Sequence, residues 1–220
     1  MIYEIYHLTY EYREGVRALD DINLKISEEP LLILGHNGAG KTTLLKILAF
    51  LLKPKEGKLI FKGKDVNKIS KVELLNLRRE VSYIPQRVTV FNGSLYEDIE
   101  YGLRIRGIKD SSERIKGALK EVGLEGLESR RAKELSGGQT RKLAIARALA
   151  IDPDVFLFDE PTSELDSYEL LERVIFKKVK EGKKIIIATT DLSFAKRLKF
   201  RAILLAKGKV IKYLDTFDSL

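Results

Sequence analysis

The sequence predicts an α/β domain that has a mostly parallel, buried sheet, an antiparallel β subdomain at its N-terminus and a helical insertion. Three observations predict this class. Four-residue apolar runs at 31–34, 155–158 and 185–188 are typical of strands covered on both faces, as parallel sheets require. Over 18–26 apolar residues recur at every second position, which is typical of a half-buried strand. From 72 to 127 the composition is helical and charged, which indicates the insertion.

Local signals predict the remaining elements. The stretch 141–150 places its apolar residues on one side of a helix, and Asp152-Pro153 closes it, because the residue before a proline avoids the helical conformation. The strand, helix and strand between 155 and 188 predict a right-handed crossover in a parallel sheet. In chain order, the other expected elements are β structure from residue 2 to 10, a helix over 42–52 that ends before Pro54, a strand at 59–61 with a turn at Gly63, a helix over 168–180, and a hairpin made of 202–206 and 210–213.

The composition narrows the classes of function. The chain has 220 residues, with 40 Lys and Arg against 32 Asp and Glu, and its net charge is +8. Because the two signs are interspersed, solvated faces explain this excess better than a nucleic-acid surface does. The sequence has no cysteine, which excludes disulfides and thiolate nucleophiles, and His7 and His36 alone do not predict a zinc site. We expect a cytoplasmic protein, because no signal-peptide order and no spanning apolar run are present.

A phosphate-binding loop is predicted at residues 35–42. Gly35-His-Asn-Gly38-Ala-Gly40-Lys41-Thr42 matches the pattern of two glycines separated by four residues and followed by Lys and Thr, with a strand before it and a helix after it. Backbone N–H groups in such a loop and at the helix start favour a polyphosphate. Lys41 would contact the β and γ phosphates, and the Thr42 hydroxyl would bind Mg²⁺. The alternative is a glycine turn followed by Lys and Thr by chance.

Two further segments place polar groups where a ligand could bind. Asp159 and Glu160 follow the strand 155–158, at the sheet edge where α/β proteins bind ligands. Asp159 would hold Mg²⁺ through water and Glu160 would polarise the attacking water, whereas a pair of helix-capping acids is the alternative. Ser136-Gly-Gly-Gln139, which leads into the helix at Arg141, would offer N–H groups to a γ-phosphate. A flexible junction between a loop and a helix is the alternative there.

At these residues the chain resembles the ATP-binding cassette (ABC) family over essentially all of 1–220. The resemblance implies a P-loop NTPase with a RecA-like parallel core, as one ABC ATPase domain with a helical subdomain at roughly 88–140. It makes 35–42 the Walker A motif, 155–160 the Walker B motif and 135–139 the family signature, with ATP and Mg²⁺ as ligands. The residues that it implies are Glu160, Lys41, Gln86 and Thr190 for catalysis; Tyr12, Val16, Gly35, Asn37, Gly38, Ala39, Gly40, Lys41, Thr42, Thr43, Ser136, Gly137, Gly138, Gln139 and Asp166 for the nucleotide; and Thr42, Gln86 and Asp159 for the metal.

Tyr12 has a competitor for its role in the family pattern, and Thr190 departs from that pattern. Tyr12 matches the aromatic that stacks on adenine, but Tyr10 competes for that role and a plain strand aromatic is the alternative. The family usually has a histidine that contacts the γ-phosphate after the strand that follows Walker B, whereas this chain has Thr190, which is shorter and carries no charge. We therefore expect ATP to bind, and hydrolysis either to be slow or to depend on water that fills the gap left by the shorter side chain. A Thr190→His variant that hydrolyses no faster than the wild type, in the assembly that supports turnover, would contradict this expectation.

The resemblance also implies partners. Two ABC subunits, identical or different, would pair head to tail, each sealing ATP between its own Walker motifs and the signature of the other, with loop 163–166 crossing between them. Segment 87–95 would dock transmembrane permease subunits, which places the chain peripherally on the cytoplasmic face of the cell membrane. A buried connection between subdomains is the alternative for this segment. The stretch 94–107 is similar to importer ATPases of the tungstate and molybdate oxyanion group.

The function implied is that of an ATPase subunit that couples ATP-driven dimer closure to substrate movement by separate membrane subunits. One alternative is a soluble ABC ATPase that acts on nucleic acid or ribosomes, although the interspersed charge leads us to expect no nucleic-acid partner. Such binding would weaken steeply with salt. Thr190 prompts a further alternative, a regulatory ABC subunit with slow turnover.

Overall fold

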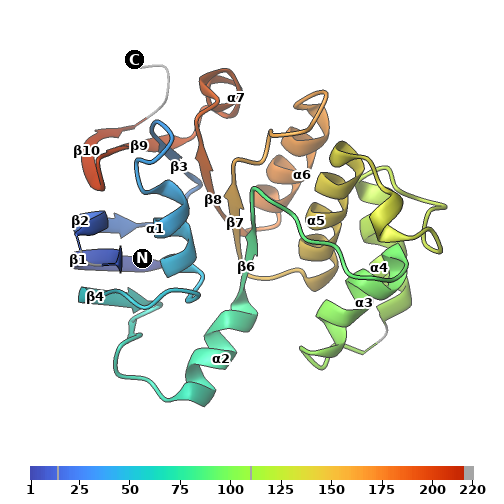
Figure 1. Cartoon of the computed structure of the whole chain (residues 1–220), viewed down its shortest axis with the longest axis horizontal. Helices are drawn as coiled ribbons and strands as arrows, with labels where there is room; N and C mark the ends of the chain where they lie inside the picture. The colour runs from blue at the N-terminus through green and yellow to red at the C-terminus, as the bar shows by residue number, and fades with distance from the viewer. Residues whose placement is uncertain (14, 110, 216–220) are drawn as a thin grey trace.

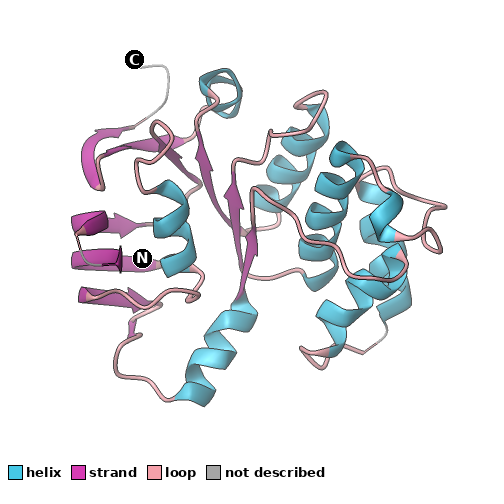
Figure 2. Ribbon diagram, in the orientation of Figure 1, coloured by secondary structure: helices cyan, strands magenta, loops and turns pink. Residues whose placement is uncertain are grey.

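The computed structural model describes residues 1–13, 15–109 and 111–215, which form two sheets and the helices that pack on them (Figures 1 and 2). One sheet has four strands in the order β2-β1-β4-β5, and the other has six in the order β10-β9-β3-β8-β7-β6. The strands of the first sheet are β1 (Tyr3–Arg13), β2 (Val16–Ile26), β4 (Glu56–Phe61) and β5 (Lys64–Asp65), and all of its pairs are antiparallel.

The six-stranded sheet is the parallel core that the apolar runs predict. Strand β3 (Leu31–Leu34) pairs in parallel with both of its neighbours, β8 (Lys184–Thr189) and β9 (Arg201–Ala206). Strand β7 (Val155–Asp159) lies between β6 (Val81–Ile84) and β8, again in parallel. All five residues of β7 are buried, which confirms a strand covered on both faces. The tail confirms the predicted hairpin, because β10 (Lys209–Leu214) pairs antiparallel with β9.

The six-stranded sheet separates two apolar clusters, one on each of its faces (Figure 1). Helix α1 (Lys41–Leu48) lies between the two sheets, and its buried residues join those of β1, β2 and β4 in one apolar cluster. The other helices are α2 (Lys71–Glu80), α3 (Leu95–Arg104), α4 (Ser111–Glu121), α5 (Gly137–Ile151), α6 (Glu169–Lys180) and α7 (Leu192–Leu198). A second apolar cluster covers the opposite face of the large sheet and includes buried residues of α3, α4, α5, α6 and α7. Along the described ranges, the structure has no helix long and apolar enough to cross a bilayer.

Three sequence expectations are corrected by the structure. The stretch 72–127 is not continuously helical, because strand β6 interrupts it; Ser82 and Tyr83 break its apolar pattern, so the sequence signal was weak, and pairing with β7 fixes it as a strand. The helix expected over 42–52 ends at Leu48, and Phe50 turns the chain with a φ of 59°. Helix α5 begins at Gly137, four residues before Arg141, because Ser136 and Gln139 form a capping box.

Candidate functional site

The glycine-rich loop between β3 and α1 approaches its neighbours too closely for a side chain. Gly40 is the N-cap of α1 with a φ of 105°, and a Cβ there would lie 2.6 Å from the Ala18 carbonyl oxygen. Only glycine both adopts this positive φ readily and leaves space for the Ala18 carbonyl. The loop therefore curls around the Lys41 side chain, which is 5% exposed and donates to the carbonyl oxygens of Gly35 (2.7 Å) and His36 (3.2 Å).

Asp159 connects this loop to the end of β7. Its carboxylate is almost fully buried, with Oδ1 accepting from the Thr42 hydroxyl at 3.0 Å and Oδ2 accepting from the Tyr83 hydroxyl at 2.8 Å. Burial, and then the neighbouring Asp159 charge, raise the pKa of Tyr83 well above its ordinary value, so this phenol remains a donor at neutral pH. The end of β6, the end of β7 and the start of α1 thus meet at one carboxylate.

Glu160 lies beside Asp159 and faces Lys41. Its side chain is 10% exposed, and its Oε1 lies 3.2 Å from Lys41 Nζ. This contact is an ion pair, and Oε1 has no hydrogen-bond partner among the described residues. Its Oε2 accepts from the Thr189 hydroxyl (3.1 Å), the Thr190 amide (2.9 Å) and the Thr190 hydroxyl (3.3 Å). With a φ of 44°, Glu160 adopts a left-handed conformation that costs about 1–3 kcal/mol and is held by these contacts.

A cavity of about 280 Å³ brings many of the expected nucleotide residues together. The Tyr12 hydroxyl lies 3.1 Å from the Thr43 hydroxyl, and Tyr10 packs edge-on against the Tyr12 ring at 5.0 Å. Strand β2 contributes Ala18 to the wall, whereas Val16 lies outside the lining set. That set is Tyr12, Ala18, Asn37, Gly38, Ala39, Gly40, Lys41, Thr42, Thr43, Gln86 and Glu160.

The segment 136–139 lines a different cavity. Ser136 caps α5 by accepting from the Gln139 amide at 3.3 Å, and the Gln139 side chain accepts from the Ser136 amide at 3.1 Å. Gly138 packs against loop 163–166, since a Cβ there would lie 2.9 Å from the Glu164 carbonyl oxygen. This second cavity of about 330 Å³ is lined by Ser136, Gly138, Gln139, Lys142, Glu164, Leu165, Asp166, Ser167 and Leu170. The expected nucleotide residues thus form two groups that share no cavity within one chain.

Arg141 supports the site, and the sequence reasoning named it only as a helix position. Arg141 is 1% exposed, and its guanidinium donates to the carbonyl oxygens of Asp159 (3.0 Å), Glu160 (2.7 Å) and Pro161 (3.1 Å). It also donates to the Pro85 carbonyl, beside Gln86. Burial lowers the pKa of Arg141 from its ordinary value. The available signal was an arginine on the apolar side of a helix, a position that a charge occupies only when it has partners.

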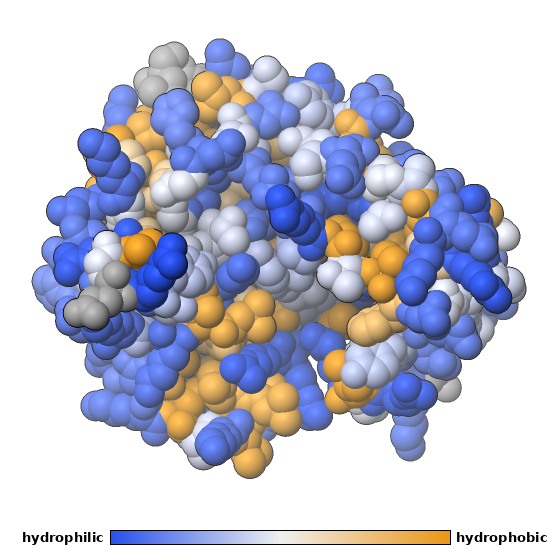
Figure 3. Space-filling view, viewed as in Figure 1, coloured by the Kyte–Doolittle hydropathy of each residue, from blue (hydrophilic) through white to orange (hydrophobic). Residues whose placement is uncertain are grey.

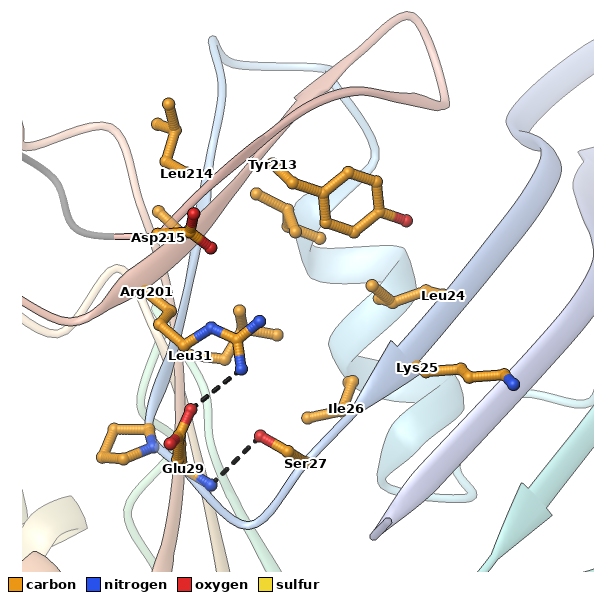
Figure 4. Close-up of a pocket in the computed structure, with 13 residues that line it drawn as sticks. Leu24, Lys25, Ile26, Ser27, Glu29, Leu31, Arg201, Tyr213, Leu214 and Asp215 are labelled. Carbon is orange, nitrogen blue, oxygen red and sulfur yellow. Dashed lines mark hydrogen bonds and ion pairs between the residues drawn. The ribbon is translucent and has the colours of Figure 1, made fainter. Parts of the chain in front are cut away.

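A further pocket lies between β2 and the β9–β10 hairpin (Figure 4). Figure 4 shows the Arg201 guanidinium next to the Glu29 carboxylate in the wall of the pocket, and the two groups form an ion pair at 2.8 Å. The Glu29 amide also donates to the Ser27 hydroxyl at 3.3 Å. None of the residues expected to bind nucleotide lines this pocket.

Comparison with known proteins gives concordant matches. The family model described as ABC transporter matches residues 19–163. A putative ABC transporter ATP-binding protein of Pyrococcus furiosus is 35% identical over 221 residues, which cover 98% of this chain and 84% of the relative. The ATP-binding cassette MJ0796, solved as a dimer in a post-hydrolysis state bound to ADP and Pi, is 31% identical with a TM-score of 0.89, covering 97% of this chain and 98% of its own. CbiO1 of Clostridium perfringens, described as part of the ABC transporter complex cbiONQ, is 31% identical with a TM-score of 0.83, covering 97% of this chain and 88% of its own.

Proposed function

Because the chain belongs to the ABC transporter family, it is an ATP-binding and ATP-hydrolysing transporter subunit, and we propose which of its residues bind ATP, hydrolyse it and transmit the result. One observation carries the proposal. Lys41 at the start of α1 meets Asp159 and Glu160 at the end of β7, at one edge of the parallel sheet, and Lys41 and Glu160 both line the cavity there. Parallel α/β sheets bind their ligands at this edge.

In this proposal the cavity beside α1 holds the nucleotide. The loop amides and the Lys41 ammonium bind the phosphates, while the exposed ring of Tyr12 stacks on the base. Glu160 accepts a proton from the attacking water, and Gln86 contacts the same space from the loop after β6. Positioning and charge stabilisation dominate the catalysis of phosphoryl transfer, so the rigid support of Glu160 is as important as its presence.

The oxygen groups at Asp159 fit Mg²⁺. No cluster of three or more His, Cys, Asp or Glu suited to a metal occurs among residues 1–13, 15–109 and 111–215. Mg²⁺ does not require such a cage, because it is usually held by one or two carboxylates together with substrate phosphates and water. The Thr42 hydroxyl and the Asp159 carboxylate, 3.0 Å apart, would hold it together with Gln86. When bound, the ion neutralises charge on the phosphates.

The separation of the two cavities supports a dimer. Ser136, Gly138 and Gln139 line a cavity other than the one lined by Lys41, so one chain alone does not surround a triphosphate with both sets of residues. A second ABC subunit, in head-to-tail orientation, would bring its signature to the nucleotide. The N-terminal end of the α5 dipole favours an anion there. Loss of the γ-phosphate then weakens the contact between subunits.

Lys41→Ala tests the nucleotide site. We expect the variant to lose ATP binding by at least about 100-fold, because the charge-assisted contacts to the phosphates disappear. Titration with a fluorescent ATP analogue measures the Kd. Lys46→Ala, in the last turn of the same helix and outside the cavity, is the matched control and should bind as the wild type does. Equal affinities for the two variants would refute the assignment of this cavity.

A groove between α2 and α3 supports docking of transmembrane subunits. It has a volume of about 370 Å³, and the exposed aromatic rings of Phe91 and Tyr101 pack together in its wall, with their centroids 4.9 Å apart. Figure 3 shows apolar side chains gathered on both sides of this hollow. The net charge of +8 suits a chain held near an anionic leaflet. We place the chain peripherally on the cytoplasmic face, and the importer group suggested by 94–107 remains a prediction.

Tyr101→Glu tests the docking groove. The added carboxylate would have to enter the interface, so we expect the amount of permease retained with the ATPase subunit to fall about tenfold or more, with ATP binding unchanged. Co-purification from membranes in which both are produced measures this. Ile211→Glu, at an exposed position on the edge strand β10, is the control. Retention that falls equally in both variants, or in neither, would argue against the groove as the docking surface.

A further inference from the structure

The two carboxylate oxygens of Glu160 have different surroundings. Oε2 accepts three hydrogen bonds from Thr189, the last residue of β8, and from Thr190, which follows it. Oε1 accepts no directed hydrogen bond within the described part of the chain, and lies 3.2 Å from the Lys41 ammonium. One oxygen is therefore fully engaged, and the other faces the phosphate-binding loop.

The hydrogen-bond pattern around Thr189 fixes the direction of its proton. The Thr189 hydroxyl oxygen accepts from the Asp191 amide at 3.0 Å. A hydroxyl that accepts from an N–H has its own proton free to donate, and Glu160 Oε2 is the acceptor at 3.1 Å. Thr189 is fully buried, and the Glu160 amide donates to the Ala188 carbonyl at 2.8 Å, so main chain and side chain of Glu160 are both tied to β8.

We propose that Thr189 and Thr190 are positioning residues that hold Oε2 of Glu160 and leave Oε1 as the oxygen that accepts the proton from water. The inference rests on the proposed role of Glu160 as the catalytic base. In that step water gives its proton to Oε1, the water oxygen bonds to the γ-phosphorus, and the bond from the γ-phosphorus to the bridging oxygen breaks, which yields ADP and phosphate. The hydroxyl of Thr190 serves the carboxylate here, whereas the sequence resemblance assigned its position to the γ-phosphate.

Glu160 has a left-handed backbone conformation, which makes the contacts to its side chain more important. A residue with a φ of 44° is held away from its preferred conformation, so its side chain needs contacts that fix its direction. Three donors on one oxygen fix both the position and the plane of the carboxylate. Tyr168 extends the support, since its hydroxyl donates to Asp191 Oδ2 at 2.7 Å and Asp191 caps α7 directly after the threonine pair.

The kinetic test compares Thr190→Val with Thr190→Ser. Valine keeps the shape and the amide but removes the hydroxyl, so we expect kcat for ATP to fall about tenfold while KM stays within about twofold, the loss of one hydrogen bond to a charged group. Serine keeps the hydroxyl and should restore kcat to near the wild-type value. An unchanged kcat in Thr190→Val, a serine variant as slow as valine, or a rise in KM alone would overturn the proposal. The last outcome would assign Thr190 to the phosphate instead.

A double-mutant cycle on thermal stability tests the contact between Thr190 and Glu160 independently of ATP hydrolysis. Thr190→Val should lower the Tm by about 3 °C in the wild-type background and by less than about 1 °C in the Glu160→Ala background, where its acceptor is missing. Equal shifts in the two backgrounds would show that Thr190 does not contact Glu160. This outcome differs from failure of the proposed function, which would appear as unchanged turnover when Glu160 itself is replaced.

Discussion

Replacing Glu160 with glutamine is expected to reduce ATP turnover by about 10²–10³-fold while ATP binding persists. Glutamine is nearly isosteric and keeps a carbonyl oxygen that Thr189 and Thr190 can donate to, but it does not accept a proton from water. Phosphate release at saturating ATP and Mg²⁺ measures the loss. Because hydrolysis no longer breaks the contact between subunits, the variant should also accumulate as an ATP-bound dimer.

The control for this experiment is Glu169→Gln. Glu169 is an exposed carboxylate in the first turn of α6 and lines neither the cavity beside α1 nor the cavity at the start of α5. Its replacement should leave turnover within about twofold of the wild type. A Glu160→Gln variant that turns over as fast as Glu169→Gln would refute the role of Glu160 as the base.

Replacing Arg141 with methionine is expected to destabilise the fold by about 3–5 kcal/mol and to lower the Tm by roughly 10 °C. Methionine fills a similar volume but leaves the carbonyl oxygens of Pro85, Asp159, Glu160 and Pro161 without the donor that they share. An unsatisfied buried acceptor costs its full desolvation. Urea or thermal unfolding measures the change, and the loops after β6 and β7 should lose protection from hydrogen exchange first.

Arg130→Met is the matched comparison for Arg141. Arg130 is exposed, and its ion pair with Glu134 spans 4.0 Å, so its replacement should change stability by no more than about 0.5 kcal/mol. Similar losses for the two variants would mean that the carbonyl contacts of Arg141 contribute little. The structure predicts instead that Arg141 joins the loop bearing Gln86 to the loop bearing Glu160.

The sequence predicted the chemistry at Lys41, Thr42, Asp159 and Glu160 because these residues belong to short local patterns. Each of these patterns fits within ten residues of sequence: one is a glycine loop between a strand and a helix, and the other is a pair of acids after a buried strand. The helix α5 and the hairpin β9–β10 were likewise predicted from local periodicity and turn signals, and the structure confirms them.

The features that sequence did not predict depend on residues that meet only in three dimensions. Arg141 donates to carbonyl groups 18 to 56 positions away in the chain. Every residue has a main-chain carbonyl, so the sequence does not indicate which of them a side chain will contact. Thr189 lies in an apolar strand, where a threonine is unremarkable until Glu160 is seen beside it. Strand β6 has only four residues, two of them Ser and Tyr, and its pairing with β7 rather than its pattern defines it.

The central claim is that ATP is held between the phosphate loop of one subunit and the signature of another, and crosslinking tests it most directly. The chain has no cysteine, so Asn37→Cys and Gln139→Cys each introduce a single thiol without background. The two variants, both carrying Glu160→Gln, are mixed with a short bifunctional thiol reagent. A covalent heterodimer that forms with ATP and Mg²⁺, and does not form without nucleotide, is the predicted result. Monomers only, at every ATP concentration, would contradict the claim.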